Sequence, residues 1–232
     1  MSLTPPFPAR VLGLTVCVVV LTGVSAPAWG QPEAYSGAEI RGWVVDAETK
    51  QPIEGVYVVA QSLLDTGLRQ YTPLHMTETI TDAKGEYHIP AWGPKPRPTF
   101  SRLEDSDPVL TFFRPGYRMF TRSNPVDRND SAVRASRWDG KTISLQPFRG
   151  TPDDWADQLW RVQSRLQWGG LASWFSRRLN DYWKHYPKTV LAIVEERRLL
   201  PDSVRHRVMD LDEWELAEEQ LRAAAQQKGR TP

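Results

Sequence analysis

The sequence IRGWVVDAETKQPIEGVYVVAQ, residues 40–61, holds two strand-like runs that a polar turn separates. A second unit of the same kind, TITDAKGEYHI, occupies residues 79–89. Both units place β-branched and aromatic residues on either side of Asp, Gly or Pro, which favour turns over strands. In the second turn, we expect the side chain of Asp82 to accept backbone hydrogen bonds. We also expect Gly85 to adopt the positive φ of a short hairpin.

Three further runs predict strands. The apolar residues 108–117 end at a Pro115-Gly116-Tyr117 turn, and residues 118–122 continue as the next strand. Residues 141–148, KTISLQPF, suit a closing edge strand. Several short strands with regular turn signals indicate an antiparallel sandwich. Three long polar intervals are expected to form loops: residues 62–74, 91–107 and 124–140.

The two turn units and the Pro-Gly-Tyr corner together resemble the carboxypeptidase regulatory-like domain, a transthyretin-like β-sandwich. The resemblance covers residues 38–148 and implies an accessory module that is not catalytic. Residues 29–37 are expected to form a flexible lead-in. The expected fold class is α+β, with an antiparallel transthyretin-like β-sandwich followed by a C-terminal helical region.

The apolar period changes after Gly150, and residues 151–227 predict a Trp-rich helical region. Its start, Thr151-Pro-Asp-Asp154, combines a hydroxyl N-cap, a proline in the first turn and acids at the positive end of the helix dipole. The apolar stripe of this first helix is Trp155, Leu159, Val162 and Leu166. Further helices are expected at 171–185, from Pro187 and from Asp210. The apolar side of the helix from Pro187 is Val190, Leu191, Val194 and Leu199. Residues 228–232 are expected to fray.

Residues 1–28 have the layout of a secretory signal peptide. Arg10 precedes an apolar run at 11–24, and small residues follow, with a cut after Ala28 or after Gly30. As a helix this run would reach about 21 Å, short of the roughly 30 Å hydrocarbon core of a bilayer. An uncleaved anchor is the alternative. The sole cysteine, Cys17, lies in the run. We therefore expect an exported protein, periplasmic or extracellular, without disulfides and without a transmembrane segment after signal cleavage.

Sequence motifs for enzyme chemistry are absent. The four histidines show no metal-ligand spacing, and there is no Gly-x-Ser-x-Gly elbow or phosphate-binding loop. We expect His88 to face solvent, because its neighbours Tyr87 and Ile89 would face the core. The closely spaced acids at 82–86 and 210–213 fit a turn and a helix cap better than a calcium site. The sequence therefore predicts a protein that is not an enzyme, with no catalytic residue, cofactor or metal.

Two groups of side chains are candidates for contact with a partner. A net charge of +1 predicts no binding to nucleic acid. Arg114, Arg118 and Arg122 flank a predicted hairpin and could form a basic face, or a solvated surface with local salt bridges. Trp160 and Trp168 fall off the strongest helical stripe and are candidates for an exposed aromatic surface.

These features suggest two functions. The first is a protein-interaction or cell-envelope structural module, and the alternative is a module that binds carbohydrate or an envelope polymer through exposed tryptophans. The expected partner is an envelope protein or a polysaccharide.

Overall fold

The computed structural model describes residues 32–67, 71–124, 131–166 and 185–208. The chain divides into two units, Met1–Gly30 and Gln31–Pro232, and every element described below belongs to the second. The expected signal peptide, the body of the helix expected at 171–185, the helix expected from Asp210, the C-terminal end and Trp168 lie outside the described residues. In the described part of the chain, no helix is both long enough and apolar enough to span a bilayer.

The described elements are mostly strands, followed by helices. The strands are β1 (Ala34–Gly37), β2 (Ile40–Asp46), β3 (Tyr57–Asp65), β4 (Tyr71–Ile80), β5 (Glu86–Ile89), β6 (Trp92–Pro96), β7 (Arg102–Leu103), β8 (Val109–Phe113), β9 (Phe120–Arg122), β10 (Val133–Arg134) and β11 (Lys141–Leu145). The helices are α1 (Pro152–Leu166), α3 (Pro187–Leu199) and α4 (Asp202–Arg205). This order makes the chain an α+β protein.

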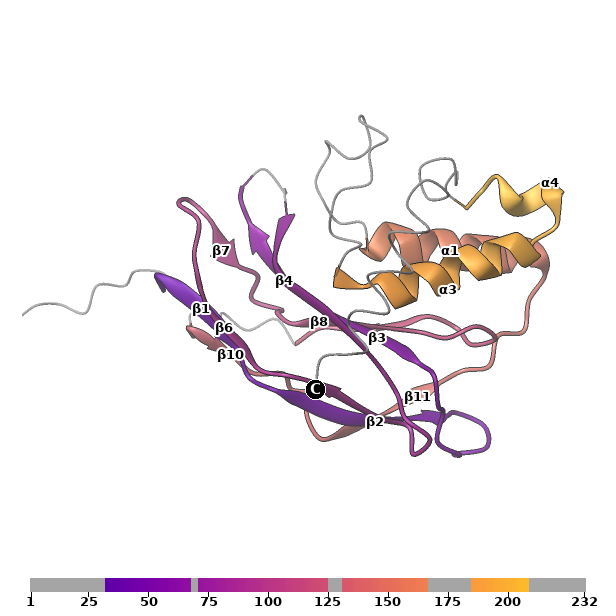
Figure 1. The fold of residues 1–232 in the computed structure, drawn as a ribbon, viewed down its shortest axis with the longest axis horizontal. Helices are drawn as coiled ribbons and strands as arrows, with labels where there is room; N and C mark the ends of the chain where they lie inside the picture. Colours follow the sequence, from indigo (N-terminus) through magenta and orange to yellow (C-terminus); the bar gives the residue numbers. More distant parts are fainter. Residues whose placement is uncertain (1–31, 68–70, 125–130, 167–184, 209–232) are drawn as a thin grey trace, which may run out of the picture. The chain divides into compact units, whose positions relative to one another are not determined.

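The strands form three sheets, with the orders β10-β1-β6, β11-β2-β5 and β4-β3-β8-β9, and β7 pairs with β3 beside the third sheet (Figure 1). Most pairs are antiparallel, as expected. Two are parallel, because β10 runs alongside β1 and β11 alongside β2 in the same direction. The sequence indicated a fully antiparallel sandwich, and that prediction was wrong for these two pairs. The prediction that residues 141–148 supply an edge strand was right for β11.

The β11-β2-β5 and β4-β3-β8-β9 sheets pack face to face around one hydrophobic core. Alternate residues of β2 are buried, which is the period of two that a strand with one solvent-facing side requires. From β2 and β5, Val44 and Tyr87 enter this core, and from the opposite sheet Val58, Leu110 and Phe112 meet them. Two sheets therefore enclose this core.

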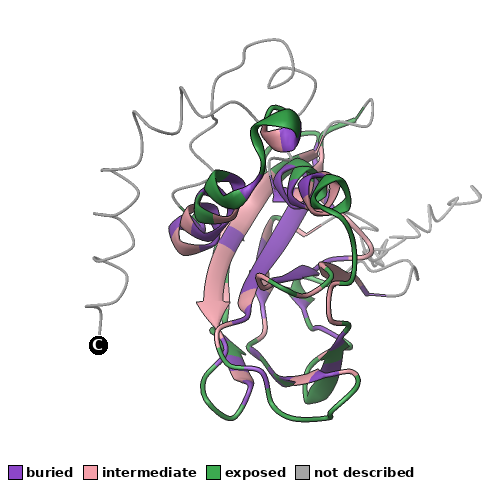
Figure 2. Cartoon of the chain, turned by 90° about the vertical axis from the view of Figure 1, so that its right-hand side faces the viewer, coloured by how far each residue is buried: buried purple, intermediate pink, exposed green. Residues whose placement is uncertain are grey.

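The helices cover the other face of the β4-β3-β8-β9 sheet (Figure 2). Val59, Met76 and Phe113, from three neighbouring strands, form a second hydrophobic cluster with α1, α3 and α4. Burial of β3 on both faces explains its almost continuous apolar run. The helical region therefore docks on the sheet through a shared core.

Asp46 organises the turn of the first sequence unit. Its Oδ1 accepts hydrogen bonds from the Glu48 and Thr49 N–H groups at 2.7 and 2.8 Å. Its Oδ2 accepts the Tyr117 hydroxyl hydrogen bond at 2.9 Å. Backbone hydrogen bonds to Thr49 and Glu48 help to hold the pKa of Asp46 below its usual value, against the opposing effect of burial. Two motifs that lie far apart in the sequence thus meet at one end of the sheets.

The second unit also connects the two layers. Asp82 accepts from the Lys84 and Glu86 N–H groups, as expected, and Gly85 has φ +70°. A Cβ at Gly85 would lie 2.4 Å from the Val44 carbonyl oxygen, so no other residue fits there without a shift of the backbone. The expected hairpin is wrong, however, because β4 pairs with β3 whereas β5 pairs with β2. The turn carries the chain from one sheet to the other.

Four segments expected to be irregular contain strands. The lead-in at 29–37 includes β1, the interval at 62–74 holds the end of β3 and the start of β4, and the interval at 91–107 holds β6 and β7. The prolines of β6 are the reason why the sequence did not predict a strand there. Proline is tolerated there because β6 is an edge strand that pairs only with β1. In the interval at 124–140, the structure places the short strand β10.

The first helix has the predicted cap and stripe. The Thr151 hydroxyl accepts from the Asp154 N–H, and the Asp154 carboxylate accepts from the Thr151 N–H at 2.8 Å, which is a reciprocal capping box. The buried residues of the stripe are Leu159, Val162 and Leu166. In α3, by contrast, Leu199 is 78% exposed, so its expected place on the apolar side was wrong. It stands at the last turn of α3, just before the chain leaves the helix.

Candidate functional site

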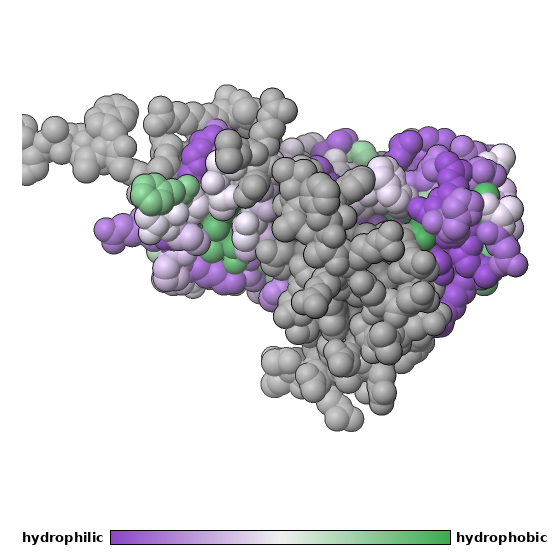
Figure 3. Space-filling view, turned by 90° about the horizontal axis from the view of Figure 1, so that it is seen from above, coloured by the Kyte–Doolittle hydropathy of each residue, from purple (hydrophilic) through white to green (hydrophobic). Residues whose placement is uncertain are grey.

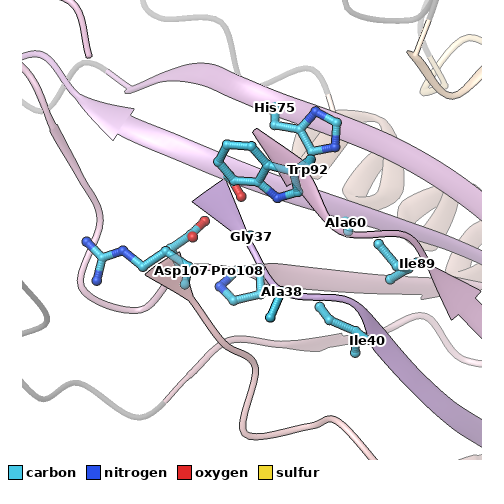
Figure 4. A pocket seen from close by; sticks show the side chains of 11 residues that line it. Gly37, Ala38, Ile40, Ala60, His75, Ile89, Trp92, Asp107 and Pro108 are labelled. Atoms are coloured by element: carbon cyan, nitrogen blue, oxygen red, sulfur yellow. The ribbon is translucent and has the colours of Figure 1, made fainter. Parts of the chain in front are cut away.

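A small cavity with a few polar groups in its lining lies where the β10-β1-β6 sheet meets β3 and the segment before β8 (Figure 4). Its polar lining comes from separate elements: Ser62 of β3, His75 of β4, Asp107 before β8 and Arg134 of β10. Trp92 of β6 closes one side, where its indole packs so closely on Gly37 that a Cβ at that position would overlap the ring. These groups lie at the opposite end of the sheets from the turn that Asp46 organises (Figure 1).

Asp107 is the most perturbed acid of the described residues. Its side chain is buried, with 1% exposure, and neither carboxylate oxygen has a hydrogen-bond partner of ordinary geometry. Burial raises the pKa of Asp107 to about 7, although the neighbouring Ser62 hydroxyl, the Arg134 guanidinium and the Leu63 N–H oppose the shift. A buried acid with a displaced pKa beside a cavity is a physical criterion for a functional site.

Arg134 is the buried cation of the same cluster. It is 2% exposed, its Nη2 donates to the Leu103 carbonyl oxygen at 3.2 Å, and the guanidinium lies 5.5 Å from the centre of the Tyr35 ring. The Nε and Nη1 atoms have no hydrogen-bond partner among the described residues. Cation and anion are therefore both buried here, and each keeps unused hydrogen-bonding capacity.

Asn124 ties the segments around the cavity together. Its side-chain nitrogen donates to the main-chain carbonyl oxygens of Asp107 and Ala135 at 2.6 and 2.9 Å. Its side-chain oxygen accepts from the Arg137 N–H at 2.9 Å. This buried amide therefore fixes the chain just after β10 to the residue that carries the perturbed carboxyl group.

The histidine and serine of the cavity are not arranged for nucleophilic catalysis. Ser62 and His75 face each other across β3 and β4. The His75 ring, however, stacks on Trp92 with 4.8 Å between ring centres, and its Nδ1 accepts from Lys95. The acid Asp107 lies beside Ser62 rather than beside His75. The serine, histidine and aspartate are therefore not placed in the sequence Ser-His-Asp that a catalytic relay requires.

The cavity is very small. The volume open to a water-sized sphere is about 10 Å³, which is the room that a single buried water needs. No cluster of three potential metal ligands occurs in the described part of the chain. The site can therefore exchange a proton or hold one water, but it cannot admit an organic substrate.

The three predicted arginines, Arg114, Arg118 and Arg122, have different surroundings. The Arg122 guanidinium lies 3.7 Å from the Phe120 ring centre and 5.1 Å from that of Trp138, so it is stacked and partly buried. Arg114 packs beside Tyr117, with its guanidinium 6.0 Å from the ring centre. Arg118 alone of the three is exposed. Of the predicted basic face, Arg118 is therefore exposed, while Arg114 and Arg122 pack beside aromatic rings.

Of the two predicted surface tryptophans, Trp160 is described and is 43% exposed on α1. The helical side, seen in Figure 3, is mostly hydrophilic at the end where α4 lies, and there Arg207 pairs with Asp153 and Asp157. Sequence reasoning did not single out Trp43, which is 39% exposed on β2. It also passed over Asp107 and Arg134, which stand in polar intervals where charged side chains are normally solvated.

No protein-family model matches the chain, and no curated protein matches it. Solved structures show only distant similarity, over about half of the chain. The 3-chlorocatechol 1,2-dioxygenase of Rhodococcus opacus 1CP is 12% identical, with 49% of this chain and 61% of that chain covered and a TM-score of 0.31. The C-terminal domain of the shaft pilin SpaA from Lactobacillus rhamnosus GG is 13% identical, with 50% and 98% covered and a TM-score of 0.24.

The major plantain pollen allergen Pla l 1 is similar at the same level, with 14% identity, 50% of this chain and 97% of that chain covered, and a TM-score of 0.29. The chain spans less than two thirds of the length of the dioxygenase. Similarities this weak define neither a family nor a function for the chain.

Proposed function

We propose that this chain is an exported, non-catalytic interaction module of the cell envelope. In this proposal residues 38–148 are a carboxypeptidase regulatory-like domain of transthyretin-like topology, and the helical region from residue 151 docks on it. A water-sized cavity and the absence of a catalytic relay around Ser62 support a binding role over an enzymatic one. Binding would then take place on the outer surface.

The open face of the β11-β2-β5 sheet is the observation that carries this proposal. Trp43 stands at the middle of β2, and its register partners are Thr142 on β11 and Glu86 on β5. Arg41 and His88, a neighbouring register pair, extend the same exposed face. The strand holds the indole in place among hydroxyl and charged groups, a composition typical of contact surfaces.

A second candidate function is the binding of a carbohydrate or envelope polymer through exposed tryptophans. Trp160 on α1 and Trp43 on β2 are exposed to similar degrees, 43% and 39%. They stand on opposite layers, since the helices and the β11-β2-β5 sheet flank the β4-β3-β8-β9 sheet on its two sides. Each tryptophan therefore serves as the matched control for the other.

The experiment is capture of partners from an envelope fraction, together with binding to a glycan array, by the full-length chain and its Trp43→Ala and Trp160→Ala variants. We expect an envelope protein to be captured by the wild type and the Trp160→Ala variant, and to be lost with Trp43→Ala. Loss of glycan binding in either variant would favour the second function instead. Undiminished protein capture by Trp43→Ala would contradict the role of the sheet face.

A further inference from the structure

The cavity around Asp107 has a built-in preference for one protonation state. An ionised carboxylate loses its hydration when it is buried, and hydrogen bonds normally offset that loss. Here neither oxygen of Asp107 has a hydrogen-bond partner of ordinary geometry, and the contacts with Ser62 and Leu63 do not offset the effect of burial on its pKa. A protonated, neutral carboxyl group costs less to bury. The closed cavity therefore favours the protonated acid, whereas an opened one would favour the ionised form.

Several charged groups face the cavity from the elements packed around it. Arg134 from β10 attracts the ionised form of Asp107, and Glu104, between β7 and β8, opposes it. His75 from β4 lines the cavity, with the Lys95 ammonium group of β6 at 3.2 Å from its Nδ1. The Arg134 side chain also reaches across to the Leu103 carbonyl oxygen. The charges that set the protonation of Asp107 thus come from the β10-β1-β6 sheet and from the layer beneath it.

The size of the cavity restricts what it can bind. About 10 Å³ accommodates one water, and it leaves no room for a hydrated ion. One water could satisfy both groups by donating to the carboxylate and accepting from the guanidinium. Apart from one water, only a proton can enter or leave the cavity.

We propose that Asp107 forms a proton-binding latch, in which its carboxyl group takes up a proton when the β10-β1-β6 sheet closes over β3 and releases that proton to solvent when the sheet opens. Acidic pH therefore favours the closed position of this sheet, and neutral to alkaline pH favours the open position. Since burial raises the pKa of Asp107 to about 7, the change falls near neutral pH. The latch is independent of the proposed binding function, which lies on another face.

The test is native-state hydrogen exchange of the full-length chain. The reporters are the Ser36 and Ala38 N–H groups, which donate to the carbonyl oxygens of Ala132 and Arg134 and so join β1 to the β10 segment. After correction for the intrinsic exchange rate, we expect the opening equilibrium at these amides to rise roughly ten- to a hundred-fold between about pH 5 and about pH 8. The Val44 N–H, bonded to Gly85 at the other end of the sheets, is the internal reference.

Asp107→Asn keeps the shape of the side chain but cannot titrate, so it should remove the pH dependence at Ser36 and Ala38. Asp105→Asn, two residues away and paired with Arg102 at the surface, should leave it intact. An equal pH dependence in the Asp107→Asn variant would overturn the latch. If that variant does not fold, a carbon-13 titration of the wild-type Asp107 carboxyl group decides: a midpoint near 7 supports the latch, and one below about 5 overturns it.

Discussion

At the scale of single residues, the contact between Asp46 and Tyr117 explains why two distant motifs occur together in this sequence. The hydroxyl donates to the carboxylate across 71 positions of chain. The same carboxylate already holds its own turn, so the tyrosine connects that turn to the Pro-Gly corner. Asp46 and Tyr117 thus hold the two motifs together as a structural clasp.

Tyr117→Phe tests this clasp. The variant removes one charge-assisted hydrogen bond and leaves the ring in place, so we expect the free energy of unfolding to fall by about 1–2 kcal/mol. Urea denaturation followed by fluorescence measures the loss. A double-mutant cycle with Asp46→Asn should show non-additive effects, and strict additivity would mean that the two groups do not interact.

Asp107→Asn should change how stability depends on pH. Because the pKa of the folded state, about 7, lies above the usual value of 3.8, the folded protein binds this proton more tightly than the unfolded chain does. The stabilisation is complete below about pH 4 and is lost as pH rises through about 7. We expect the variant to gain up to about 4 kcal/mol over the wild type between these limits, at 1.36 kcal/mol per pKa unit. Urea denaturation across this pH range measures the difference.

At the scale of elements, β4 supplies the cap of α3. The Glu78 carboxylate accepts from the Lys188 and Thr189 N–H groups at 3.0 Å and from the Thr189 hydroxyl at 2.9 Å. The residue before α3, Tyr186, makes no side-chain cap of its own. A strand residue therefore satisfies N–H groups that the helix leaves open, and it fixes the start of the helix to the sheet.

Glu78→Gln should lower the free energy of unfolding by about 1–2 kcal/mol, since an amide keeps one acceptor oxygen but loses the charge that favours the helix N-terminus. Glu195→Gln is the matched control, because Glu195 is an exposed acid of α3, the helix that Glu78 caps. Thermal denaturation of the two variants compares them. Equal losses of stability in the two variants would show that the effect comes from net charge and that the cap does not contribute.

The elements divide into those that sequence patterns predict and those that they do not. β2, β8 and α1 carry dense local signals: alternation, a bounded apolar run, and a capping box with a stripe. β6 carries prolines, and β7 and β10 have two residues each, so their existence depends on the partner strand rather than on propensity. Pairing across sheets likewise could not be predicted from the two turns, which look like hairpin turns.

The candidate site was not predictable for a related reason. Asp107 stands in a polar interval, where an acid is normally solvated. Its burial follows from packing between the segment before β8 and β10, residues that are remote in sequence. Trp160 was predictable because helical spacing alone places it off the buried stripe. The predicted basic face stays a prediction; in the structure Arg122 is stacked on an aromatic ring, whereas Arg118 is exposed.

At the scale of the whole molecule, the β4-β3-β8-β9 sheet belongs to two cores at once. Its inner face packs on β2 and β5, and its outer face packs on the helices. Separating either the helices or the β11-β2-β5 sheet from this central sheet would expose apolar surface. We therefore expect helices and strands to unfold in a single transition.

Phe113→Ala tests this coupling, because Phe113 is 1% exposed and stands between β8 and the helical layer. We expect a loss of about 3–5 kcal/mol, with circular dichroism and tryptophan fluorescence shifting to the same new midpoint. A variant in which the helical signal melts well before the fluorescence change would show that the helical layer folds separately.

The parallel pairing of β2 with β11 has a consequence for the order in which this chain can fold. β2 ends at Asp46, and its partner spans Lys141–Leu145, so nearly a hundred residues must be available before the pair can form. Contacts so remote along the chain slow folding, because the intervening loop must close first. Until then β2 presents an open backbone edge to any other strand. The nascent chain is thus most prone to aggregation in the interval between the synthesis of β2 and that of β11, the last strand of the sheet to be made.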